Sequence, residues 1–183
     1  MKLILLLVLI LVAVSANADL YSEILLSIDS TDVRNVGVGY VTDHQQFRES
    51  RILTNGVSTN TPQADIVWHS SRILASGASE SLDLRGGLVD TFGNAVDFVR
   101  VRGIMALNLG TTTIALGGDP AGPLSSIFSV ATGGILLPGS GSLLLFSPIL
   151  GYSVSTDTAD LLRVDNAMGG TGSYKIMVLG NNH

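Results

Sequence analysis

Three histidines are the first side chains to consider for chemistry, because imidazole can act as a general base or a metal ligand. They are His44, His69 and His183, the last residue of the chain. A zinc site needs several ligands to converge, and no two of these histidines have the spacing of a ligand pair. No activated nucleophile lies near His69 in the sequence. We therefore predict no metal site, and we interpret His69 as a strand residue with a satisfied hydrogen bond.

Serine and aspartate residues occur in contexts that are typical of turns. Ser140 lies between two glycines, without the strand–turn–helix context of a nucleophile elbow. The glycine-rich residues 117–119 lack the lysine and the helix of a phosphate-binding loop. Asp157, Asp160 and Asp165 would suit a calcium loop, but they lack EF-hand spacing, and a solvated turn is the preferred interpretation. The sequence thus predicts no catalytic residue and no cofactor.

Aromatic side chains offer another kind of chemistry, a platform that stacks on sugar rings. The chain has one tryptophan and four tyrosines: Trp68, Tyr21, Tyr40, Tyr152 and Tyr174. With so few aromatics, packing in the core or at its rim is the preferred interpretation. The residues that we keep as candidates for contact with a surface or a ligand are Trp68, His69 and Arg72.

Composition narrows the class of protein. The chain has 183 residues, of which 46% are hydrophobic and 14% charged, so it suits one domain with a real core. It has no cysteine, which excludes disulfides and thiolate metal sites. Its formal net charge is −5 and its only lysines are Lys2 and Lys175, so we predict no binding to nucleic acid.

The amino terminus resembles a secretory signal. One lysine precedes an apolar run from Leu3 to Val14, and Ala16-x-Ala18 fits the small-residue rule for cleavage before Asp19. As a helix, this run would span about 18 Å, which is short of a bilayer core of roughly 30 Å. Residues 1–18 are therefore interpreted as a cleaved signal peptide or, alternatively, as a retained apolar strand at a subunit contact. Membrane contact is expected only through this segment.

Scarce aromatics and abundant Leu, Val, Ile and Gly favour short strands joined by tight turns. Turn-forming side chains at Asp29–Asp32 and an Asn55-Gly56 pair mark expected turns, the second of them a hairpin. Gly37 and Gly39 weaken the strand that contains them. The first expected elements are a strand at 20–28, a weak strand at 33–41, a polar loop at 43–50 and a short strand at 51–54.

The middle of the chain carries the clearest strand pattern. Residues 64–75 have a polar patch, 69–72, where we expect a strand to bend or bulge. Residues 96–109 alternate between apolar and polar side chains with a slip in phase near Gly103, which predicts one long strand with a buried face. Within it, Phe98 and Val101 are predicted to be core residues. Arg100 and Arg102 are predicted to face outward or to pair with Asp83 or Asp97.

About ten to twelve short strands at spacings near 8 to 12 residues are expected in all, among them residues 142–146 and 173–179, which is typical of a sandwich or barrel. No internal repeat occurs at a fixed period, so a solenoid or propeller is not predicted. The fold class is all-β, and residues 19–183 are predicted to form a single antiparallel β-sandwich, of which a jelly roll is one form.

An ordered set of short motifs between Gln63 and the end of the chain resembles small virion-associated proteins encoded in the structural gene clusters of tailed phages. The motifs are Gln63-Ala64-Asp65, His69, Arg72-x-Leu74, Ser81-Leu82-Asp83-Leu84, Gly87-Leu88-x-Asp90-x-Phe92-Gly93, Phe98-x-Arg100-Val101, Gly139-Ser140-Gly141-Ser142-Leu143-Leu144-Leu145, Gly151-Tyr152-x-Val154, Thr158-Ala159-Asp160-Leu161-Leu162-x-Val164-x-Asn166 and Tyr174-x-Ile176. The signal-like amino terminus departs from that group.

The resemblance implies a non-enzymatic β-sandwich protein of the virion, a capsid decoration, cement or spike element. Its expected partners are the major capsid protein or other virion proteins, and we expect it to form a homo-oligomer, specifically a trimer. The alternative is a secreted bacterial β-sandwich, such as a glycan-binding or adhesive module, which the signal-like amino terminus favours. The expected location is therefore the virion, or the extracellular space under the alternative.

Overall fold

A computed structural model describes residues 20–130, 132–166 and 169–182 of the chain. The predicted signal segment, residues 1–18, and His183 lie outside the described residues. Within them the regular elements are all strands, and most pairings are antiparallel. The prediction of an all-β fold with an antiparallel β-sandwich is confirmed.

Fourteen strands occur in the described part of the chain. Two of them, β1 (Ser22–Asn35) and β2 (Tyr40–Asn55), are 14 and 16 residues long, far longer than the sequence pattern predicted. The others are β3 (Gln63–Ala64), β4 (Ile66–Leu74), β5 (Ser79–Asp83), β6 (Arg85–Val89), β7 (Ala95–Asp97), β8 (Arg100–Asn108), β9 (Ile114–Gly118), β10 (Gly134–Leu137), β11 (Ser142–Phe146), β12 (Tyr152–Ser153), β13 (Leu161–Asp165) and β14 (Gly172–Asn181).

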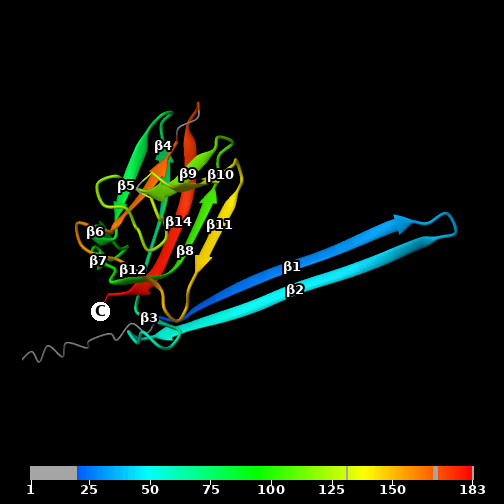
Figure 1. Cartoon of the computed structure of the whole chain (residues 1–183), viewed down its shortest axis with the longest axis horizontal. Coiled ribbons are helices and arrows are strands. Elements are labelled where there is room, and N and C mark those ends of the chain that lie inside the picture. The colour runs from blue at the N-terminus through cyan, green and yellow to red at the C-terminus, as the bar shows by residue number, and fades with distance from the viewer. Residues whose placement is uncertain (1–19, 131, 167–168, 183) are drawn as a thin grey trace, which may run out of the picture.

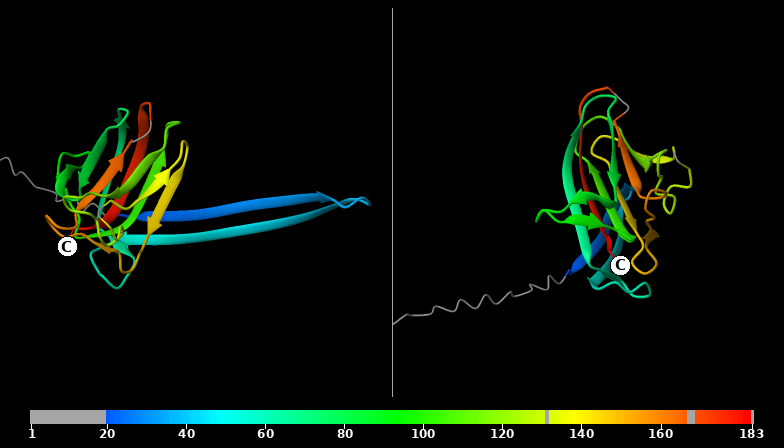
Figure 2. Two further views of the ribbon diagram at one scale, coloured as in Figure 1. Left: turned by 45° about the horizontal axis from the view of Figure 1, so that its top comes forward. Right: turned by 90° about the vertical axis from the view of Figure 1, so that its left-hand side faces the viewer.

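Two sheets form the body of the molecule, which we define as residues 66–181 (Figure 1). One has the order β11-β8-β14-β4, with β12 also paired to β8, and the other has the order β10-β9-β13-β5. The eight strands of these two orders pair in a nested way, so that the first pairs with the last, the second with the seventh, the third with the sixth and the fourth with the fifth. Figure 2 shows the two sheets face to face.

The core lies between the two sheets and is filled by alternate residues of the strands. Trp68 on β4, Ile104 on β8 and Val178 on β14 meet Leu116 on β9 and Leu162 on β13 in one cluster, and each is at most 3% exposed. This alternation is the period-two pattern of strands with one buried face. The short β6–β7 hairpin adds Leu88 and Val96 to the same core.

The first part of the described chain forms a hairpin arm that projects away from the body (Figures 1 and 2). We define the arm as residues 22–55, which comprise β1, β2 and the turn between them. The prediction placed residues 19–183 in one β-sandwich domain and did not foresee this arm. The expected turn at Asp29–Asp32 and the expected loop at 43–50 are wrong, because both segments lie within the paired strands.

The prediction of a hairpin turn at Asn55-Gly56 is also wrong. After β2 the chain loops back and β3 runs parallel to the end of β2, with Thr54 opposite Gln63. The reason is a long-range contact: the Asn181 side-chain amide on β14 donates to the carbonyls of both Gly56 and Gln63, at 2.7 and 3.3 Å. These two hydrogen bonds hold the segment between Gly56 and Gln63 against β14, so the chain does not form a tight hairpin turn at Asn55-Gly56.

Two further predictions are corrected in the body. Strand β4 runs without a bulge through the polar patch 69–72: it pairs with β14 in unbroken register, and the patch alternates between exposed and half-buried side chains. The predicted long strand 96–109 is two strands, β7 and β8, separated by Phe98 and Val99. Phe98 and Val101 are fully buried, as predicted.

The predicted slip in phase is a β-bulge that changes the direction of an arginine. Leu179 pairs with Gly103 and Gly180 with Val101, so Arg102 has no partner on β14. Arg102 is 0% exposed, which contradicts the prediction that it faces outward. Asp97 pairs with Arg85 instead, at 3.1 Å.

Candidate functional site

The arm is the most unusual feature of the molecule and the candidate functional site. Its two strands pair in register over fourteen residues, from Ser22 opposite Leu53 to Asn35 opposite Tyr40. At about 3.3 Å per residue, β1 is about 46 Å long. Every residue from 25 to 52 is exposed. A two-stranded ribbon of this kind is at best marginally stable in water by itself.

Cross-strand side-chain contacts explain why the polar middle of the arm is strand and not loop. The Asp29 carboxylate accepts hydrogen bonds from His44 at 2.6 Å and from Gln46 at 3.3 Å. Nearer the body, the Ser50 hydroxyl donates to Glu23 at 2.7 Å. These aspartate and glutamate side chains find partners across the ribbon, so they do not cap a local turn.

The turn at the end of the arm is built from Asn35 and two glycines. The Gly37 amide donates to the Asn35 side chain and the Val36 amide donates to the Gly39 carbonyl, both at 2.9 Å. Gly37 has a φ of 82°, a conformation in which residues with a side chain are strained. The glycines that the sequence pattern treated as weak points of a strand are therefore what closes the hairpin.

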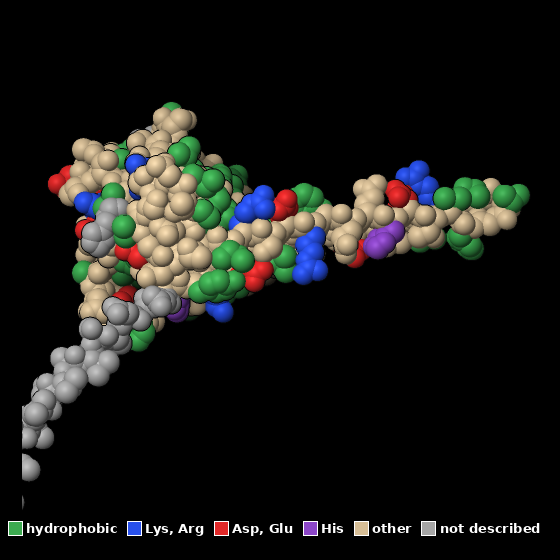
Figure 3. Space-filling model, turned by 90° about the horizontal axis from the view of Figure 1, so that it is seen from below, with side chains coloured by type: hydrophobic (Ala, Val, Ile, Leu, Met, Phe, Trp, Pro, Cys, Tyr) green, Lys and Arg blue, Asp and Glu red, His purple; other side chains and the backbone are tan. Residues whose placement is uncertain are grey.

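Hydrophobic side chains gather at the end of the arm, which we call the tip and define as residues 33–41 (Figure 3). Val38 is 98% exposed and Tyr40 is 75% exposed. Val33, Val36 and Val41 are also more than half exposed. An apolar surface on a narrow projection is typical of a contact with another molecule, because water hydrates it poorly.

The base of the arm is fixed to the body by packing. Leu53, which is fully buried, belongs to a small cluster with Ala64 and Leu179, and Ile24 and Phe146 pack against it. One apolar stretch of the ribbon thus already lies on the outer face of the β11-β8-β14-β4 sheet. The rest of the ribbon extends beyond the body (Figure 3).

The buried Arg102 holds the loop that follows the arm. Its guanidinium donates to the Ser58 carbonyl at 2.7 Å, to the Asn181 side chain at 2.6 Å and to the Ile149 carbonyl. Burial, with a smaller contribution from the positive charge of Arg100, lowers the pKa of Arg102. This network joins residues far apart in the chain and holds the loop after β2 against the body.

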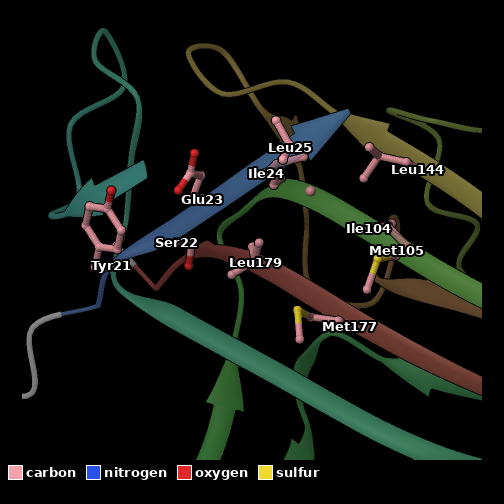
Figure 4. Close-up of a pocket in the computed structure, with 11 residues that line it drawn as sticks. Tyr21, Ser22, Glu23, Ile24, Leu25, Ile104, Met105, Leu144, Met177 and Leu179 are labelled. Carbon is pink, nitrogen blue, oxygen red and sulfur yellow. The ribbon is translucent and has the colours of Figure 1, made fainter. Parts of the chain in front are cut away.

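A hollow of about 480 Å³ lies between the arm base and the outer face of the sheet (Figure 4). Met105 and Met177 form its floor, and they are register partners on β8 and β14. Leu144 on β11 and Leu25 on β1 flank it. Methionine side chains are flexible and polarisable, and they suit a surface that adapts to an apolar partner.

The three residues kept as contact candidates do not share a surface. Trp68 is 3% exposed and belongs to the core, and its indole donates to the Val89 carbonyl at 3.1 Å. Arg72 lies over the Trp68 ring at 5.5 Å and pairs with Glu80 at 2.6 Å. Glu80 also accepts from the Tyr174 hydroxyl, whose pKa is raised by burial and by this bond. His69 is exposed, next to Met177 on the outer face.

The other side chains considered for chemistry are spread across the body and the arm. His44 lies on the arm and His69 on β4. Asp160 is buried and its carboxylate accepts from the Asp157 amide at 2.6 Å, while Asp165 pairs with Arg163 at 2.8 Å. In the described residues, no group of three or more His, Asp or Glu side chains could hold a metal ion.

The tyrosines divide between the two regions. Tyr174 is buried in the core, Tyr152 is half-buried, and Tyr21 and Tyr40 are exposed on the arm or beside it.

No sequence motif indicated the arm. The signal that could have revealed it is the pair of glycines at 37 and 39, with polar stretches of similar length on either side.

No protein-family model matches this sequence, and no curated protein matches it either. Among the residues that the structure describes, no helix has the length and hydropathy needed to cross a bilayer. The site must therefore be judged on its own geometry.

Proposed function

We propose that this protein is a non-enzymatic structural subunit of a virion, attached to the capsid as a decoration, cement or spike element. The observation that carries the proposal is the arm: a ribbon about 46 Å long with every residue from 25 to 52 exposed. Such a ribbon gains its stability from a partner, since it buries too little surface by itself. An assembled shell offers many copies of such a partner.

The strand order of the body supports the same role. The nested pairing of first with last and second with seventh strand is the order expected of a jelly roll, a fold used by viral capsid and lectin domains. The motifs that resemble tailed-phage virion proteins lie in this body, except for Gln63-Ala64-Asp65, which comes directly before it. A rigid body with an extended arm suits a protein whose task is to assemble.

The expected partners are the major capsid protein or other virion proteins, together with further copies of this chain as a trimer. Mass spectrometry of purified particles tests the role. The expected result is peptides of this protein at a constant ratio to the shell protein, including arm peptides from residues 22–55. If virus particles produced from the genome that encodes this protein do not contain it, the proposal is overturned.

The alternative is a secreted glycan-binding or adhesive module, located outside the cell. Two observations favour it: the signal-like residues 1–18, and the use of the jelly roll by lectins. A glycan array with the purified chain separates the two roles. Saturable binding to one glycan class, together with absence from particles, would favour the secreted module.

A further inference from the structure

Three side chains that can bind a metal ion lie in one row across the outer face of the β11-β8-β14-β4 sheet. His69 on β4 is the register partner of Met177 on β14, and Met177 is the register partner of Met105 on β8. Directly opposite residues of an antiparallel pair point to the same face of the sheet. The imidazole of His69 therefore lies on the same face as the two thioethers, with Met177 in the middle.

These three side chains line one hollow of about 330 Å³, next to the hollow at the arm base. Met105 is 39% exposed, Met177 is half-buried and His69 is exposed, so an ion from solvent can reach all three. Figure 4 shows Met105 and Met177 on neighbouring strands. The remaining side chains around the hollow of 330 Å³ are those of Ser70, Ser71, Leu107, Lys175 and Ile176.

The spacing of the strands allows the three donor atoms to converge. Neighbouring strands are about 4.8 Å apart, so an ion above Met177 lies about one strand spacing from the backbone of His69 and from that of Met105. Three rotatable bonds let the Met105 sulfur turn toward β14, and rotation of His69 turns a ring nitrogen the same way. Metal–ligand distances of about 2.0 to 2.3 Å then fit between the strands.

The imidazole of His69 is available for such a bond. His44 on the arm is paired with Asp29 at 2.6 Å. Among the described residues, by contrast, none forms a hydrogen bond or an ion pair with the His69 ring. The interpretation of His69 as a strand residue with a satisfied hydrogen bond is therefore correct for the strand only. A ring nitrogen with a free lone pair is a metal ligand of the commonest kind.

The chemistry of the donors selects the ion. Two thioethers and a neutral imidazole are soft or borderline ligands without charge, a set that favours Cu(I). Zinc takes thiolate, imidazole or carboxylate ligands, and calcium and magnesium take oxygen ligands. None of the described residues that line the hollow is acidic, and Lys175 adds a positive charge. That charge opposes a divalent cation more strongly than a monovalent one.

We infer that His69, Met105 and Met177 form a binding site for one Cu(I) ion. This binding activity goes beyond the proposed structural role and depends neither on the arm nor on the virion. It also departs from the expectation of no metal site, which rested on the spacing of histidines along the chain. Spacing along the chain does not reveal ligands that the pairing of three strands brings together.

Methyl NMR of the natural chain tests the site without any substitution. The probe is Ag(I), a soft monovalent ion that needs no reductant. The chain has four methionines, Met1, Met105, Met168 and Met177. With one equivalent of Ag(I), the methyl signals of Met105 and Met177 should shift, while those of Met1 and Met168 should stay in place. If Met105 and Met177 do not both shift, or if all four signals shift alike, the inference is overturned.

Competition for Cu(I) with bicinchoninate, under anaerobic reducing conditions, tests the ligands one by one. Met177→Leu keeps the volume of the side chain and removes its sulfur, so it should weaken Cu(I) binding at least tenfold. His69→Gln should do the same. The matched control is His44→Gln, which changes the exposed histidine of the arm and should leave the affinity as it is. Equal losses for the two histidines, or an unchanged affinity in Met177→Leu, would contradict the assignment.

Zinc tests the selectivity of the same site. A tenfold excess of Zn(II) should leave the Met105 and Met177 methyl signals of the Ag(I)-loaded chain unchanged, because zinc has little affinity for thioethers. Return of both signals to their metal-free positions would show that Zn(II) displaces the soft ion. That result would overturn the inference of a site selective for Cu(I).

Discussion

The body and the arm are built from the same kind of strand, yet they are stabilised differently. In the body, residues such as Phe98, Ile104 and Leu162 are fully buried between two sheets. In the arm, Ile28 and Phe47 lie directly opposite each other but are 58% and 50% exposed. Backbone pairing and exposed cross-strand side-chain contacts therefore maintain the arm beyond its base, whereas the strands of the body are also packed in a closed core. The difference is the reason that we propose a partner for the arm and none for the folding of the body.

The largest expected effect compares a phenylalanine in each region. Phe98→Ala leaves a cavity in a closed core and should lower the free energy of unfolding by about 3 to 5 kcal/mol. Phe47→Ala on the arm should lower it by less than about 0.5 kcal/mol, because the side chain gains little burial in a single copy. Urea unfolding of the monomer followed by tryptophan fluorescence measures both. Equal losses would show that the arm is part of the cooperative body.

The junction between the two regions depends on a buried charge. Arg102→Ala leaves the Ser58 and Ile149 carbonyls and the Asn181 side chain without their donor, and should cost about 3 kcal/mol. Arg100→Ala is the matched control, since it loses one hydrogen bond to the exposed Leu150 carbonyl. It should cost less than about 1 kcal/mol. A control as damaging as Arg102→Ala in urea unfolding would refute the assigned role of the junction.

Acid should weaken the body through Asp119. Hydrogen bonds from the Ser81 hydroxyl and the Ala121 amide hold the pKa of Asp119 below its ordinary value of 3.8. Because the folded-state pKa is the lower one, this carboxylate stabilises the fold above pH 3.8, and its contribution is lost as pH falls through the folded-state pKa.

Asp119→Asn should therefore cost about 1 to 2 kcal/mol at pH 7 and progressively less as the pH falls below 3.8. Urea midpoints of the natural chain and the variant, measured at pH 7 and at pH 3, test this. A gap in stability that stays constant between the two pH values would exclude the proposed contribution of Asp119.

The smallest effect is expected in the middle of the arm. His44→Ala removes an exposed contact with Asp29 and should change the unfolding free energy of the single copy by less than about 0.5 kcal/mol. Its effect should appear instead as faster amide hydrogen exchange in β1 and β2. Unchanged exchange rates in both strands would mean that this pair does not support the ribbon.

The sequence predicted the later strands well, because each has one face in the core. Residues 142–146 were expected as a strand and form β11 with the same bounds, and residues 173–179 lie within β14. Burial imposes the alternation that sequence patterns reveal. Phe98 and Val101 could be assigned to the core for the same reason.

The arm could not be predicted in this way, because neither of its faces is buried. Its strands contain Asp29, Asp32 and Asp43, which favour turns, and only pairing across the ribbon makes them strand residues. Arg102 was missed for a related reason, since the bulge that turns it inward depends on its pairing with β14. Local patterns do not contain such long-range pairings.

Hydrogen exchange, measured by mass spectrometry in dilute single copies and in the associated form, tests whether the arm depends on a partner. We expect amides of residues 25–52 to exchange quickly in the single copy and to become strongly protected on association, while amides in β8 and β14 are protected in both. Arm amides that are as well protected in the single copy as those of β8 would contradict it, because the arm would then need no partner.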